Sequence, residues 1–479
     1  MYIGSIYQVL AGKTIIFLHW KIFLSSKIWT TMNERRDFIK ISAAGVLALL
    51  TSRTYKKPHS HFFIQNVDNR KLFFGDQEPH PLRDRAREIA INILKPSKRD
   101  LEHGLELHAE SLVFDTYGFM PRAAYDGAAI AQLIDSGASP LEIKDLQEDH
   151  SMCRFVDNDR ERYEFIENWK ASGVTAVFQN AGEEGNAIDV LIKRLARFTY
   201  ATDMMSDTLI KAVKTKDLHQ AKQEGKHALY FSGNGVPMPL DLVSVEEELR
   251  YIRVFYQLGI RMMHLTYNRR NLIGDGCGER SDAGLSDFGR EVVREMNRVG
   301  VLVDVAHSGW QTSLEAAELS SKPMVASHST CAGLFEHIRS KPDRVIAKIA
   351  DTGGYIGICC IPRFLGGDGN IAKMMQHIDY VVRHFGADHV GIGTDVAASS
   401  QYSEQENALI PAHYAGRNRW EALWPKDTFT TTQEMKDSMM WTNWPLFTVG
   451  LVQLGYSDSD IQKIIGGNAV RVLKTLEIT

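Results

Sequence analysis

Two short apolar runs of the sequence each end close to a histidine. The run VLVDVAHSG begins at Val301 and contains His307, and the run PMVASHST begins at Pro323 and contains His328. A later run, HVGIGTD, ends on Asp395. Imidazole is a common metal ligand, and a carboxylate completes or serves such a site. The pattern indicates metal-linked chemistry, and the alternative is a set of hydrogen-bonded structural groups.

These residues need a fold that brings separate strand ends together. Eight short apolar runs recur, and they begin at Ser111, Val174, His227, Arg261, Val301, Met324, Gly354 and His389. Amphipathic segments lie between most of them, such as one that Ser244 would cap and one that Ser286 would cap and Gly300 would end. This alternation predicts an α/β protein, a (β/α)8 TIM barrel, whose chemistry lies at the carboxyl ends of the strands. A doubly wound sheet is the alternative, but no glycine-rich phosphate loop follows an early strand.

Composition narrows the class of protein. The chain has 479 residues, 44% of them hydrophobic, and a formal net charge of -4. No basic stripe interleaved with aromatic residues is present, so we do not expect a nucleic-acid partner. The five cysteines lack CxxC spacing, which predicts free thiols rather than a disulfide framework or a cysteine zinc site.

The amino-terminal segment predicts export. In ERRDFIKISAAGVLALLTS, Arg35 and Arg36 precede a modest apolar stretch, a pattern typical of a twin-arginine signal, and Met32 is the expected natural start. We therefore expect a periplasmic or membrane-associated protein, and a signal anchor that tethers the chain to a membrane is the alternative. The predicted organisation is an upstream extension, signal and linker over 1–55, a lead-in segment over 56–105, and the barrel with carboxyl-terminal helices over 106–479.

Several longer motifs resemble one family. They are LVDVAHSG, MVASHSTCAGLFEHIRSKPD, HVGIGTD, YQLGIRMMHLTYN, GLSDFGREVVREMNRVG and TNWPLFTVGLVQLGYSDSDIQKIIGGNAVRVL. Together they resemble the renal or membrane dipeptidases, metallopeptidases of the amidohydrolase superfamily, over about Leu112 to Leu473. The resemblance implies a barrel with two zinc ions that hydrolyses dipeptides, including some with a carboxyl-terminal D-residue, and it implies a homodimer.

The resemblance also assigns roles to four residues. His307 and His328 match two zinc ligands, and Asp395 matches the acid/base aspartate. Arg339 matches the arginine that holds the substrate carboxylate, for which a planar guanidinium is suited.

Other positions depart from the family pattern. The family's first strand ends Asp-Gly-His-Asn-Asp, where this chain has Asp115, Thr116, Tyr117, Gly118 and Phe119. Asn234 stands for the bridging glutamate, and Tyr267 stands for a substrate-facing histidine. Two zinc ions need carboxylates to balance their charge, and neutral Tyr117 and Asn234 cannot supply them. We therefore expect one zinc ion rather than two.

A single site needs a carboxylate besides the two histidines. Asp395 is one candidate, and Asp115 is a second that would leave Asp395 free to transfer protons. The alternative role of Asp115 is to order a loop through backbone hydrogen bonds. Tyr267 is a candidate oxyanion donor, and Asn234 and Tyr117 are candidate substrate contacts.

The predicted function is hydrolysis of dipeptides by metal-activated water. Two alternatives are an altered single-metal amidohydrolase with another substrate and an inactive barrel that binds a peptide or a small carboxylate. The segment 404–434 follows the eighth strand and contains His413, Trp420 and Trp424. It is expected either to form a lid or pocket wall or to pack against its own barrel.

Overall fold

Eight parallel strands surround the core of the computed structural model, which describes residues 80–182, 185–414, 424–425 and 427–477. They are β1 (Phe114–Gly118), β2 (Ala176–Asn180), β4 (His227–Gly233), β5 (Ile260–His264), β6 (Leu302–Asp304), β7 (Val325–Cys331), β9 (Tyr355–Ile358) and β10 (Val390–Ile392), hydrogen-bonded in that order. Two short strands lie off this path: β3 (Leu209–Lys211) pairs with β4, and β8 (Ser340–Lys341) pairs with β7. Each of the eight predicted apolar runs overlaps one of these eight strands.

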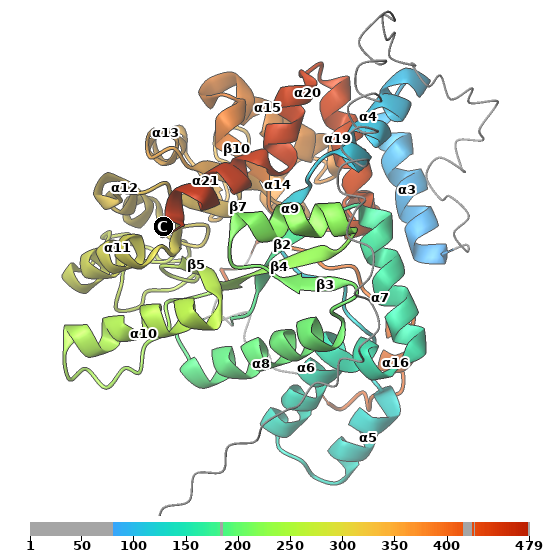
Figure 1. The fold of residues 1–479 in the computed structure, drawn as a ribbon, viewed down its shortest axis with the longest axis horizontal. Helices are drawn as coiled ribbons and strands as arrows, with labels where there is room; N and C mark the ends of the chain where they lie inside the picture. Colours follow the sequence, from blue (N-terminus) through green and yellow to red (C-terminus); the bar gives the residue numbers. More distant parts are fainter. Residues whose placement is uncertain (1–79, 183–184, 415–423, 426, 478–479) are drawn as a thin grey trace, which may run out of the picture. The chain divides into compact units, whose positions relative to one another are not determined.

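The ring closes where the chain leaving β10 meets β1. The backbone N–H of Asp395 donates to the carbonyl of Tyr117 at 2.9 Å, and the N–H of Thr394 donates to the carboxylate of Asp115 at 2.9 Å. Helices surround the strands on the outside (Figure 1). The predicted (β/α)8 barrel is confirmed.

The helices follow the strands along the chain. Before and within the first half of the barrel lie α3 (Pro81–Leu94), α4 (Lys98–Glu110), α5 (Gly127–Asp135), α6 (Pro140–Asp157), α7 (Asp159–Ser172), α8 (Ile188–Met204), α9 (Thr215–Glu224) and α10 (Val245–Leu258). The second half has α11 (Asp287–Val299), α12 (Trp310–Leu319), α13 (Asp343–Asp351), α14 (Pro362–Leu365), α15 (Ile371–Phe385) and the short η1 (Ala387–His389). After β10 come α16 (Ser403–Asn407), α18 (Gln433–Ser438), η2 (Trp441–Asn443), α19 (Trp444–Gln453), α20 (Asp458–Gln462), η3 (Lys463–Gly467) and α21 (Asn468–Leu476).

Local sequence signals set the ends of the barrel helices. The side chain of Ser244 accepts a hydrogen bond from Glu247 N at the start of α10, and Ser286 accepts one from Gly289 N at the start of α11. Both helices end on a glycine in the left-handed region, Gly259 at φ 116° and Gly300 at φ 89°. A side chain would be strained there, so these glycines stop the helices where the following strand must begin.

An apolar layer fills the barrel below its carboxyl-end mouth. Seven strands contribute to one buried cluster, through Phe114, Phe178, Tyr230, Met262, Leu302, Val325 and Tyr355. Residues two apart on a strand share a face, so His264 and Asp304 lie one layer above Met262 and Leu302. The polar groups of the mouth therefore lie directly above a packed apolar layer.

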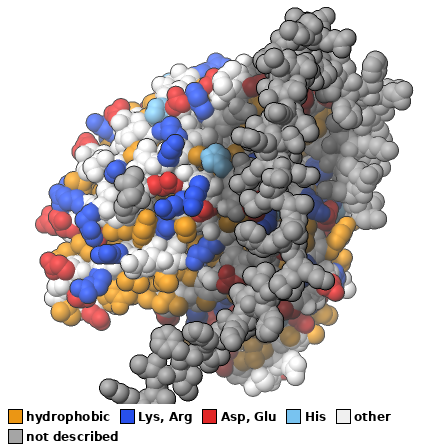
Figure 2. Space-filling view, viewed as in Figure 1, with side chains coloured by type: hydrophobic (Ala, Val, Ile, Leu, Met, Phe, Trp, Pro, Cys, Tyr) orange, Lys and Arg blue, Asp and Glu red, His pale blue; other side chains and the backbone are white. Residues whose placement is uncertain are grey.

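Three further features concern the cysteines, the surface charges and the hydrophobicity of the helices. All five cysteines are free thiols, as predicted. Acidic and basic side chains are interspersed over the face shown in Figure 2. None of the helices in the described part of the chain is long and apolar enough to span a bilayer. The twin-arginine motif and Met32 lie outside the described residues.

A buried histidine predicts how acid affects the fold. His108 of α4 bonds Thr448 of α19 and the carbonyl of Ser172 at the end of α7, both at 2.8 Å. Burial lowers the pKa of His108 from 6.5 to about 4, so below pH 6.5 the unfolded chain binds a proton that the folded chain does not. Stability must therefore fall as the pH falls.

We predict that this one group costs about 2 kcal/mol of unfolding free energy between pH 7 and pH 5. Urea unfolding of the wild type and of His108→Gln at both pH values measures the difference. The variant should lose less stability on acidification than the wild type, and equal losses would contradict the assignment.

Candidate active site

Two imidazoles from neighbouring strand ends meet in the barrel mouth. His328 belongs to β7 and His307 follows β6, and their Nε2 atoms lie 3.0 Å apart. Both side chains are buried. The structure thus brings together the pair that the sequence singles out.

The other nitrogen of each ring shows where its proton lies. His307 Nδ1 is 2.7 Å from the side-chain oxygen of Asn268, which accepts hydrogen bonds. His328 Nδ1 is 2.8 Å from the hydroxyl of Ser327, which donates its own hydrogen to Asp304. Each ring therefore carries its hydrogen on Nδ1.

Two Nε2 lone pairs consequently face each other. Burial, followed by the positive charge of Arg339, holds the pKa of both His307 and His328 well below the usual value, so both rings are neutral. Neutral lone pairs at this separation repel unless a cation lies between or beside them. The pair has the chemistry of a metal-binding site.

A third histidine and an aspartate lie beside this pair. His264 Nε2 is 2.6 Å from Asp304 Oδ2, and both side chains are completely buried. The possible ligand atoms of His264, Asp304 and His328 lie within 4.8 Å of one another. The ring centre of His264 lies 5.3 Å from that of His307 and 5.4 Å from that of His328.

Asp304 is held firmly in its ionised form. Burial alone would raise its pKa, but the interaction with His264 and the hydrogen bonds from Ser327 outweigh burial and lower it. Ala306 N and Ser327 N both donate to Oδ1. His264 Nδ1, by contrast, has no hydrogen-bond partner among the described residues. Asp304 therefore orients His264 through Nε2 and leaves Nδ1 available.

Neutral groups occupy the side of the site that β1 and β4 provide. The ring of Tyr117 stacks on His328 with centres 3.8 Å apart, and its hydroxyl donates to the side-chain oxygen of Asn234. Burial raises the pKa of Tyr117 well above its usual value, so the hydroxyl stays protonated. These two residues bond to each other and bring no negative charge.

Asp115 has a different set of partners. Its carboxylate accepts hydrogen bonds from Thr394 Oγ1 at 2.6 Å, Thr394 N at 2.9 Å and Trp441 Nε1 at 3.0 Å. It ties β1 to the chain after β10 and to η2. These contacts fit the loop-ordering role, and the ligand role stays a prediction.

Asp395 lies at the closure of the barrel. Its φ of 58° is in the left-handed region, an uncommon conformation for aspartate that often marks a functional position. Burial raises its pKa to about 6, although Arg339, His264 and Arg122 attract its charged form. A carboxylate with this pKa can exchange a proton near neutral pH.

Arg339 is buried and only partly bonded. Its guanidinium donates to the carbonyl of His328 at 2.8 Å and to that of Ala306 at 3.3 Å, and Nη1 has no partner among the described residues. A buried donor of this kind is suited to an anionic ligand.

Aromatic side chains form a wall beside His307. Tyr267 stacks on it with ring centres 4.0 Å apart, and Trp424 lies 6.2 Å from it and stacks on Phe364 at 5.5 Å. Trp424, from the segment 404–434, thus packs against the barrel beside His307. His413 is exposed, and Trp420 lies outside the described residues.

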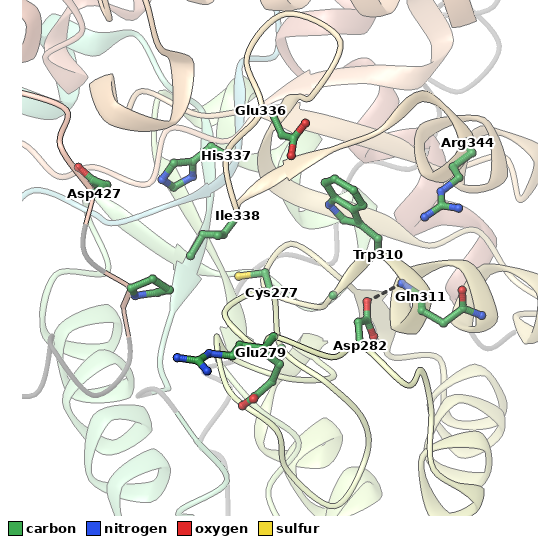
Figure 3. A pocket seen from close by; sticks show the side chains of 14 residues that line it. Cys277, Glu279, Asp282, Trp310, Gln311, Glu336, His337, Ile338, Arg344 and Asp427 are labelled. Atoms are coloured by element: carbon green, nitrogen blue, oxygen red, sulfur yellow. Dashed lines mark hydrogen bonds between the residues drawn. The ribbon is translucent and has the colours of Figure 1, made fainter.

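A cavity of about 690 Å³ lies next to this wall. Cys277, Trp310, His337 and Ile338 contribute to its lining (Figure 3). The thiol of Cys277 donates to the side-chain oxygen of Asn268 at 3.2 Å, the same oxygen that His307 bonds. The imidazole pair does not line this cavity, which is therefore a neighbour of the site rather than the site itself.

Sequence reasoning missed His264 and Asp304. Both stand inside apolar runs, RMMHLT and VLVDVAH, rather than at their ends. One sequence signal could have found them, because residues two apart on a strand share a face. His264 follows Met262 at this spacing, and Asp304 follows Leu302, so each polar side chain points to the same side as a core residue.

Comparisons with known proteins agree with this architecture. A family model described as membrane dipeptidase (peptidase family M19) matches residues 130–408. The chain is 28% identical over 280 residues to dipeptidase tcpJ of Claviceps purpurea, covering 57% of each chain. It is 29% identical over 229 residues to dipeptidase verJ of Clonostachys rogersoniana, covering 47% of this chain and 51% of that one. The chain spans about half the length of the curated relatives it matches.

Solved structures share the fold. An amidohydrolase from Pseudomonas aeruginosa aligns with a TM-score of 0.58 and 28% identity, over 78% of this chain and 98% of that one. A metallopeptidase from Rhodobacter sphaeroides, liganded with a phosphinate mimic of L-Ala-D-Ala, aligns with a TM-score of 0.54 and 16% identity, over 77% of this chain and 100% of that one. The second likeness shows the fold alone.

Asp115 gives a prediction that separates its two possible roles. Asp115→Asn replaces an accepting oxygen by an N–H₂ group that faces the donors of Thr394 and Trp441. We therefore expect a loss of about 2 kcal/mol in unfolding free energy, measured by urea unfolding. The metal content of the folded variant, measured by elemental analysis, should equal that of the wild type. A folded variant that has lost its metal would instead make Asp115 a ligand.

Proposed function

The chain belongs to the membrane dipeptidase family, and from this premise we propose that it is a metal-dependent hydrolase that cleaves dipeptides. The observation that carries the proposal is the facing pair of neutral Nε2 atoms of His307 and His328, 3.0 Å apart in a buried site. The barrel places this pair at the carboxyl ends of the strands, where such folds perform their chemistry.

One zinc ion fits these residues better than two. We propose that His307, His328 and His264 hold it, with His264 oriented by Asp304. A site of three imidazoles with an open position is a known catalytic form for zinc, and a carboxylate behind a ligating histidine is its usual support. Tyr117 and Asn234 offer no negative charge for a second ion.

Histidine ligation would leave Asp395 free. A bound zinc ion lowers the pKa of a coordinated water and polarises the scissile carbonyl. Asp395, with a pKa raised to about 6, would accept the proton of the attacking water and pass it to the leaving amine. Arg339 Nη1 would hold the substrate carboxylate, and the Tyr267 hydroxyl would donate to the developing oxyanion.

Export and assembly are further proposals. Arg35 and Arg36 support export by the twin-arginine route to a periplasmic or membrane-associated position. The family resemblance supports a homodimer.

The function is tested on protein folded in the cell. We expect about one zinc per chain by elemental analysis and cleavage of L,L or L,D dipeptides. The double variant His307→Ala, His328→Ala should lose both, while His413→Ala, a change at an exposed histidine, should lose neither. A parent protein without metal or cleavage would support a binding barrel, and a metal-loaded parent that cuts no dipeptide would support a hydrolase of another substrate.

The third ligand has its own test. His264→Ala should weaken zinc binding by about 100-fold, measured by competition with a chelator, because it removes one of three ligands. Urea unfolding of metal-free protein provides the control for fold damage. A His264→Ala variant that keeps wild-type zinc affinity would show that His264 is not a zinc ligand.

A further inference from the structure

A second cavity, of about 230 Å³, opens at the carboxyl ends of β1 and β2. Its charged lining residues are Arg122, Lys144, Arg194 and Glu148. Lys144 and Arg194 have partners outside this lining, so the attraction of the cavity for a negatively charged ligand group depends on Arg122.

Ion pairs already occupy the other charged groups of this lining. The Glu148 carboxylate is shared by Arg194 at 2.7 Å, Arg197 at 2.7 Å and Lys144 at 3.7 Å. Arg197 also pairs with Asp149 and Asp145.

Arg122 is the cation of this group that has no anionic partner. Its guanidinium lies over the ring of Phe119, 4.5 Å from the ring centre, and it makes no hydrogen bond or ion pair with another described residue. Solvent reaches the side chain, yet the surrounding protein lowers its pKa. It projects into the cavity as an available bidentate donor.

A chain of aromatic contacts links Arg122 to the imidazole site. Tyr117 stacks on His328 at 3.8 Å, and its ring centre is 6.2 Å from that of Phe119, which carries Arg122. Arg122 also lies close enough to Asp395 to attract its charged form, as Arg339 does. Arg339 and Arg122 are thus two of the three guanidinium groups, with that of Arg363, that act on Asp395.

These two arginines come from different parts of the mouth. Arg339 precedes β8, which pairs with β7, whereas Arg122 follows β1, and β9 and β10 lie between β7 and β1 in the sheet order. If Arg339 holds the carboxyl-terminal carboxylate, the residue on the other side of the scissile bond is the amino-terminal one. With the carboxyl terminus held by Arg339, the side chain of the amino-terminal residue is the part of the dipeptide that we expect to lie toward Arg122.

We propose that Arg122 binds a carboxylate on the side chain of the amino-terminal residue, so that the preferred substrates are dipeptides that begin with glutamate or aspartate. This inference rests on the proposed function and names its substrate class. A paired guanidinium and carboxylate supplies both charge and geometry for that selection.

The test compares Glu-Ala with its neutral isostere Gln-Ala, with alanine of either chirality. The zinc-loaded wild type should show a kcat/KM ratio of about tenfold or more in favour of Glu-Ala. In Arg122→Gln this ratio should fall to about one, and Arg122→Lys should keep part of it because the charge remains. Arg250→Gln, a change at an exposed arginine of α10, is the matched control and should keep the full ratio.

Binding of non-cleavable ketomethylene analogues of the two peptides, measured by calorimetry, separates the two proposals. If neither peptide is cut, the proposed hydrolysis fails, and an analogue preference that Arg122→Gln abolishes would still support this inference. The proposed role of Arg122 would be overturned, even if dipeptides are hydrolysed, by either of two results. One is a wild-type ratio of Glu-Ala to Gln-Ala near one, and the other is a ratio that Arg122→Gln leaves unchanged.

Discussion

Two neutral imidazole nitrogens that face each other without a hydrogen between them impose the main constraint on this molecule. The hydrogen bonds of His307 to Asn268 and of His328 to Ser327 fix both tautomers. The resulting lone pairs, 3.0 Å apart in a buried place, are unfavourable for a folded protein by itself. Their repulsion is relieved by a bound cation, so the site is built for one.

The charges around the pair are the basis for proposing a single ion. Asp304 supplies one buried negative charge and uses it to orient His264 and Ser327. On the other side, Tyr117 and Asn234 satisfy each other as a neutral pair. We propose that electrostatic balance in this buried site, as well as the number of ligands, limits how many cations the mouth can hold. The departures from the family pattern thus form a consistent set.

The barrel could be predicted because its information is local. Each buried strand is a short apolar run, and serine caps and terminal glycines mark the helices between them, as Ser244 and Gly259 do for α10. His307 and His328 could be predicted as neighbours because the carboxyl ends of adjacent parallel strands meet. Both inferences need only the sequence near each residue.

The rest depended on distant contacts and on register. Strand alternation alone would put Asp115 and Tyr117 on one face of β1, but the pairing of β1 with β2 shifts between Asp115 and Gly118, which changes where side chains point. Trp441, a partner of Asp115, lies far along the chain, and no local pattern announces it. His264 was hidden because a histidine within an apolar run looks like a core residue until its neighbour Asp304 is known.

X-ray absorption at the zinc edge of the metal-loaded protein tests the central claim most directly. We predict one zinc per chain with three imidazole nitrogens at about 2.0–2.1 Å and one further light ligand. Protein that retains no zinc at neutral pH, or a spectrum with fewer than two imidazole ligands, would contradict this prediction.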